Sequence, residues 1–130
     1  MKKFDNFCKA LENLKQIENY SEPYDTVTET GLVALFEVCF EQASKAMKEV
    51  LEYHGYDDSK TGSPRMIVKL AFSAGMITDE KAWLSALSSR NDVSHSYNEE
   101  IALSIIRKTS DSFIKIFDDL KTEIENYWLD

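Results

Sequence analysis

The chain has 130 residues, a length that fits one domain with one core, so we expect a single helical domain over residues 1–130. Its formal net charge is −8, which argues against broad, salt-driven binding of nucleic acid. Any nucleic-acid site must therefore be a local basic pocket. Glycine and proline are scarce, with four and two residues, and this favours long regular elements.

The two cysteines, Cys8 and Cys39, lie on apolar helical stripes and lack the spacing of a metal site. This predicts two buried thiols in a reducing compartment rather than a disulfide. No signal peptide is apparent over residues 1–6, and the most apolar run, residues 31–40, is too short to span a membrane. We expect a cytoplasmic protein with no membrane attachment, no metal and no cofactor.

The first predicted helix runs from about Lys3 to Tyr20, because apolar residues recur at three- and four-residue spacing before Pro23. The second begins near Thr26, where Thr26 and Glu29 have the spacing of a capping box. Its first half is apolar around most of its circumference. We therefore expect a central helix, packed on two sides or against a second subunit.

The next two helices are predicted from their ends. Gly55 is a natural left-handed C-cap for the second helix. Ser63 and Pro64 then have the residue types of an N-cap and a first helical position, and Gly75 closes this third helix. Thr78 is expected to cap a fourth helix, which leads directly into Arg90.

A fifth helix is predicted to start at Asn98 and to carry one apolar stripe from Ile101 to Tyr127, about seven turns. No strand, repeat or low-complexity segment is apparent. The expected fold is all-α, an up-and-down bundle of about five helices joined by short connections.

The most informative stretch is Arg90-Asn91-Asp92-Val93-Ser94-His95-Ser96-Tyr97, between the fourth and fifth helices. An arginine can hold phosphate through its planar fork of donors, and a histidine can move protons near neutral pH. If the helix continues through this motif, Asn91 and His95 share a face, whereas Arg90 and His95 do not. A long arginine side chain or a helix break could still bring the last two to one pocket.

A purely structural interpretation competes with this one. Arg90 could cap the end of the helix and pair with Asp92, with His95 as a polar connector and Tyr97 as a packed aromatic. The serines beside His95 do not make a nucleophile triad, because adjacent side chains rarely point at each other. His54, the other histidine, is expected to be a solvated helix end.

Several short motifs follow one another in order across the five predicted helices, and they strengthen the functional interpretation. They are Gly62-Ser63-Pro64-Arg65, Ala71, Gly75-Met76-Ile77, Asp79, Trp83-Leu84, Arg90-Asn91 and Ser94-His95-Ser96-Tyr97. From about Phe4 to Tyr127 the chain resembles the HEPN superfamily (higher eukaryotes and prokaryotes nucleotide-binding). Within it, the chain is similar to the nucleotidyltransferase substrate-binding proteins, the partners of minimal nucleotidyltransferases.

The resemblance implies a HEPN-like four-helix core and a homodimer in which the R-x4-H pockets of two protomers meet. It also implies, in active members, a metal-independent endoribonuclease. Arg90 would then stabilise the scissile phosphate, His95 would transfer protons as the ribose 2′-hydroxyl attacks, and Asn91 would orient the site. In toxin–antitoxin members the position of Tyr97 can be adenylylated by the partner nucleotidyltransferase, which silences the toxin.

Three hypotheses remain open from the sequence. The chain is a HEPN subunit that binds nucleotide or RNA phosphate and cleaves RNA, or a non-catalytic docking subunit that presents Tyr97, or a dimeric bundle whose polar motif only cements the interface. Ser96 and Asn98 stand where threonine and aspartate are more frequent in the family, which is a mild departure.

Overall fold

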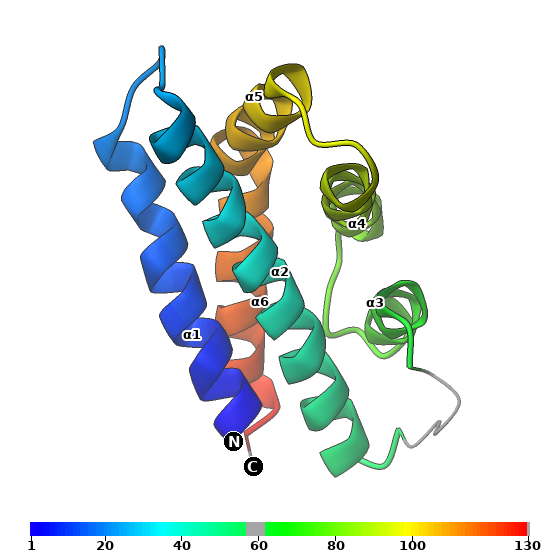
Figure 1. Cartoon of the computed structure of the whole chain (residues 1–130). Helices are drawn as coiled ribbons and strands as arrows, with labels where there is room; N and C mark the ends of the chain where they lie inside the picture. The colour runs from blue at the N-terminus through cyan, green and yellow to red at the C-terminus, as the bar shows by residue number, and fades with distance from the viewer. Residues whose placement is uncertain (57–61, 130) are drawn as a thin grey trace.

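The computed structural model describes residues 1–56 and 62–129, and within these ranges every regular element is helical (Figure 1). This confirms the all-α prediction. The predicted fifth helix is continuous but consists of three parts, with a π-helical segment in its middle. The elements are α1 (Lys2–Leu14), the 3₁₀ segment η1 (Lys15–Asn19), α2 (Thr26–Tyr53), α3 (Pro64–Ser73), α4 (Glu80–His95), α5 (Glu99–Lys108), the π segment η2 (Thr109–Phe113) and α6 (Ile114–Tyr127).

Helix α2 is the centre of the bundle. It packs against α1, α3, α4 and α5, and α1 also packs against α6. In Figure 1, α1 lies beside α2 and α6, whereas α3 and α4 are seen nearly end-on and so run across them. The prediction that α2 is packed on more than one side is confirmed, because its apolar first half meets a neighbour on several faces.

Two predicted N-caps were wrong by one residue. Helix α2 is capped by Asp25 rather than by a Thr26–Glu29 box, and α4 is capped by Asp79 rather than by Thr78. Each aspartate accepts a hydrogen bond from the backbone N–H three residues further on, at 2.8 Å and 3.0 Å. A carboxylate at the positive end of a helix is a stronger acceptor than a hydroxyl, which explains the choice at both sites.

The other helix ends follow the sequence. Ser63 caps α3 with Pro64 at its first position, and Asn98 caps α5. Gly55 and Gly75 adopt φ values of 86° and 81°, a left-handed conformation that glycine reaches without strain. These positions are decided by local backbone requirements, and for this reason the sequence predicts them correctly.

The core is built around aromatic rings. Trp83 of α4 packs against Phe40 of α2 and Phe117 of α6, with ring centroids 6.3 Å and 5.4 Å apart. Cys39 is buried in this core, as predicted, whereas Cys8 is only half-buried; neither forms a disulfide. Burial raises the pKa of both thiols.

His54 was expected to be solvated, and this was wrong. It is half-buried at the end of α2, with its Nε2 2.6 Å from the carbonyl oxygen of Trp128 and the two rings edge to face. The end of α6 packs over the end of α2, so this histidine joins two elements far apart in the sequence. In residues 1–56 and 62–129, no helix combines the length and apolarity that a membrane span requires.

Candidate functional site

The R-x4-H motif lies on one uninterrupted helix, because α4 continues to His95 and ends at Ser96. Five residues along an α-helix correspond to about 7.5 Å of rise and to a rotation about 140° beyond one full turn. Arg90 is half-buried and His95 is exposed. The helix does not break to bring Arg90 and His95 together, so within one protomer they lie on different faces.

Arg90 is not held by the contacts that a purely structural interpretation requires. No carboxylate in the described part of the chain forms an ion pair with it, and α4 continues for five residues beyond it. Its Nη1 donates one long hydrogen bond, 3.4 Å, to Oδ1 of Asn91. Burial raises the pKa of the nearby Glu37 carboxyl, and the charge of Arg90 opposes this rise. Most donors of the guanidinium therefore have no partner among the described residues.

Asn91 and His95 lie one turn apart on the same exposed face of α4, as expected for a continuous helix. The hydroxyl of Ser94 donates to the carbonyl oxygen of Arg90 at 3.2 Å, so it is turned back onto its own helix. The face offers an amide and an imidazole to solvent.

Tyr97 is 46% exposed and is not a packed aromatic. Its phenolic oxygen lies 3.2 Å from Oγ1 of Thr30, so the two hydroxyls share a hydrogen bond across the boundary between the motif and α2. The phenol is therefore accessible and has a defined contact.

An exposed row of small and apolar residues follows α2 beside the motif. We call it the α2 stripe, and it comprises Val27, Gly31, Ala34 and Val38, which recur at helical spacing. Val27 and Val38 are 83% and 52% exposed, and a Cβ added at Gly31 would meet no atom within 4 Å. Packing within the chain thus gives no reason for a glycine there. At one edge of the stripe, Thr30 contacts Tyr97, which follows α4, and Glu37 lies near Arg90 of α4.

On another side, Arg90 borders a groove of about 260 Å³ between α2 and the start of α3, which we call the α2–α3 groove. Lys45 and Lys48 of α2 also line it. The sequence did not indicate that these two lysines line a groove, because lysines on an amphipathic helix ordinarily indicate a solvated face. Their i, i+3 spacing was the available signal, but the neighbouring α3 that completes the groove is supplied only by the tertiary structure.

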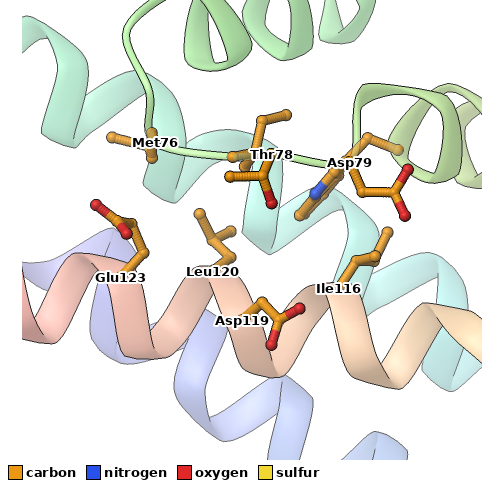
Figure 2. Close-up of a pocket in the computed structure, with 9 residues that line it drawn as sticks. Met76, Thr78, Asp79, Ile116, Asp119, Leu120 and Glu123 are labelled. Carbon is orange, nitrogen blue, oxygen red and sulfur yellow. The ribbon is translucent and has the colours of Figure 1, made fainter.

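A second pocket, of about 100 Å³, lies between the linker before α4 and helix α6 (Figure 2). It is acidic, with Asp79, Asp119 and Glu123 in its lining. Each carboxylate already has a structural partner: Asp79 caps α4, Asp119 pairs with a lysine at 2.7 Å, and Glu123 accepts from the indole N–H of Trp128 at 3.0 Å. Like charge makes this pocket unsuitable for phosphate. No group of three potential metal ligands is present among residues 1–56 and 62–129.

Comparisons with known proteins found similar sequences and a similar fold. The family model described as "Nucleotidyltransferase substrate binding protein like" matches residues 2–126. A Haemophilus influenzae protein named as a probable ribonuclease, HepT, is 28% identical over 87 residues, which are 65% of this chain and 60% of that protein. The match thus spans less than two thirds of that relative. A crystal structure of a Thermus thermophilus protein has a TM-score of 0.79 at 25% identity, covering 91% of this chain and 98% of the other.

Proposed function

Because the chain belongs to the nucleotidyltransferase substrate-binding-protein-like family, we propose that it is the HEPN subunit of a two-protein module with a minimal nucleotidyltransferase. In this proposal Arg90, Asn91 and His95 bind the phosphate of a nucleotide or of RNA in the cytoplasm. The observation that carries it is Arg90, a half-buried guanidinium without an ion-pair partner among the described residues of an acidic protein. Such a group is a strong local anion site.

The working unit is a homodimer in this proposal. One protomer carries Arg90 and His95 on different faces of α4, so a second protomer is needed to surround one phosphate with both residue types. The α2 stripe lies beside the motif and exposes apolar surface that a second copy could cover. Gly31 and Ala34 would allow two copies of α2 to approach closely. A two-fold axis here would place two motifs next to each other.

The reaction of this site would be RNA cleavage without a metal. The 2′-oxygen of a ribose attacks the adjacent phosphorus, the bond to the 5′-oxygen of the next nucleotide breaks, and a 2′,3′-cyclic phosphate forms. His95 accepts the proton of the 2′-hydroxyl, and an imidazolium returns a proton to the departing 5′-oxygen. Arg90 stabilises the charge that develops on the phosphate oxygens. A probable ribonuclease among the similar proteins supports this reaction class.

The test is cleavage of RNA by purified protein in the presence of a chelator. His95→Ala and Arg90→Ala should each lower the rate at least about a hundredfold, the usual contribution of a proton-transfer group or of a transition-state donor. His54→Gln is the control for loss of a histidine, because His54 lies outside the R-x4-H motif, at the end of α2 in contact with Trp128. Equal cleavage by wild type and His95→Ala, or no cleavage by any protein, refutes the catalytic role.

The same variants separate phosphate binding from a purely structural motif. If the motif only cements the dimer, Arg90→Ala weakens dimerisation and leaves RNA and nucleotide binding by the remaining dimer unchanged. Phosphate binding by Arg90 predicts the opposite pattern. Binding measured at protein concentrations where both proteins are dimeric distinguishes the two.

A second function is favoured by the exposure of Tyr97 and by its contact with Thr30. Here the chain is a non-catalytic docking subunit that presents this phenol to the nucleotidyltransferase. The phenolic oxygen attacks the α-phosphorus of ATP, pyrophosphate leaves, the phenolic proton passes to solvent, and tyrosyl-AMP remains. Mass spectrometry after incubation with the partner enzyme and ATP would detect the added AMP. A Tyr97→Phe protein that gains AMP as readily as wild type excludes Tyr97 as the acceptor.

A further inference from the structure

We infer that the α2–α3 groove holds the base and ribose of a nucleotide whose phosphate lies against Arg90. This inference rests on the proposed phosphate binding by Arg90 and states where the rest of the nucleotide is bound. The groove of about 260 Å³ is slightly smaller than the ~300–1,000 Å³ of pockets that hold drug-sized ligands. One nucleotide unit fits this size, whereas a duplex does not.

The floor of the groove has the apolar surface that binds the face of a nucleobase. Phe40 and Ile67 form its buried part, and the half-buried Pro64 forms a wall. The hydroxyl of Ser44 is also at the groove and donates to the carbonyl oxygen of Phe40 at 3.1 Å. Apolar surfaces bind the faces of bases with little regard to sequence. The first turn of α3 adds the positive end of its helix dipole to the same wall.

The rim of the groove has the opposite charge to the ligand. Among the described residues that line it, Lys45, Lys48 and Arg90 stand against one carboxylate, that of Glu41, so this part of the lining is positive although the chain carries −8. Nζ of Lys45 lies 3.6 Å from Glu41, and Nζ of Lys48 lies 4.0 Å from Glu52. Exposed pairs of this kind contribute little energy, so both ammonium groups can turn to a phosphate.

Two other hollows, both lined by described residues, lack this combination of an apolar floor and a positive rim. A hollow of about 310 Å³ beside α5 has Asp92 and Glu100 against Lys108. A shallow one of about 330 Å³ near Lys3 shares the two groove lysines, but its lining has two carboxylates, Glu49 and Glu52, and no apolar residue. Charge complementarity therefore selects the α2–α3 groove as the site for an anionic ligand with an apolar face.

The test uses the intact chain, a fluorescent single-stranded RNA and 5′-AMP. Lys48→Glu reverses one rim charge, and Lys9→Glu makes the same change at an exposed position of α1 as a matched control. Ser44→Leu fills the groove without changing charge, and circular dichroism verifies its folding. Lys48→Glu and Ser44→Leu should each weaken ligand binding at least about tenfold, while Lys9→Glu changes it less than about twofold. Lys48→Glu should also reduce the salt dependence of RNA binding.

Arg90→Ala distinguishes this inference from the proposed function. If Arg90→Ala loses binding while Lys48→Glu and Ser44→Leu bind as wild type does, the groove assignment is overturned and the phosphate site remains. If Arg90→Ala binds as wild type does, phosphate binding at Arg90 is overturned as well. If the groove variants bind 5′-AMP more weakly but bind RNA as wild type does, the groove is assigned to a free nucleotide. If they bind RNA more weakly, the groove is assigned to one nucleotide of an RNA strand.

Discussion

Replacing Val38 with aspartate should dissociate the proposed homodimer. Val38 is 52% exposed on the α2 stripe, beside the R-x4-H motif. Complete burial of a valine side chain is worth roughly 1.5–3 kcal/mol, so burial of the exposed half is worth about 0.8–1.5 kcal/mol. In a two-fold symmetric interface each substitution occurs twice, which gives ~1.5–3 kcal/mol for the dimer.

This energy corresponds to a roughly ten- to hundredfold increase in the dimer dissociation constant. It is a lower limit for Val38→Asp, because a new carboxylate would also lose water in the interface. Sedimentation equilibrium over a range of protein concentrations measures the constant directly. Phe72→Asp is the matched control, since Phe72 is 44% exposed on α3, outside the stripe.

The expected result is weakened association for Val38→Asp alone, with helix content unchanged by circular dichroism. Two results with the variants would refute the reasoning. One is a Val38→Asp protein that dimerises as tightly as wild type. The other is an equal or greater loss for Phe72→Asp, which would move the interface to α3. A wild-type protein that stays monomeric at high concentration would refute the proposed homodimer itself.

Three further predictions concern stability and thiol reactivity. Oδ1 of Asn98 caps α5 by accepting a hydrogen bond from the backbone N–H of Ile101 at 2.9 Å. Asn98→Ala removes this cap and should lower the free energy of unfolding, measured by urea denaturation, by ~0.5–2 kcal/mol. An unchanged urea midpoint contradicts this prediction. The backbone N–H of Thr28 lowers the pKa of Asp25 below its ordinary value of 3.8, so the stability that its charge contributes is present above that value and lost as the pH falls through the folded-state pKa. Asp25→Asn should therefore lose less stability than wild type on acidification, and parallel acid-unfolding curves contradict this. In native protein a thiol reagent at mildly alkaline pH should label Cys8 slowly and Cys39 only after unfolding, because burial raises the pKa of both thiols; rapid labelling of both contradicts it.

The sequence alone determined the helical elements and most of their ends. Gly55, Gly75, Ser63 and Asn98 stand where predicted, because a helix end must satisfy its free backbone groups within a few residues. The errors at the caps of α2 and α4 were one residue long, since two neighbouring side chains competed for the same backbone donors. The ordered motifs likewise indicated the family, which the match over residues 2–126 confirms.

The tertiary structure alone decided what surrounds the motif. Periodicity did not reveal that α4 continues to His95, that Thr30 contacts Tyr97, or that Arg90 borders a groove completed by α3. His54 was misjudged for the same reason, because its partner is 74 residues away. Apart from the length of α4, these features depend on how the helices pack against one another. Crossing geometry is set by the packing of whole helix faces, whereas a helix end is set by a few adjacent residues.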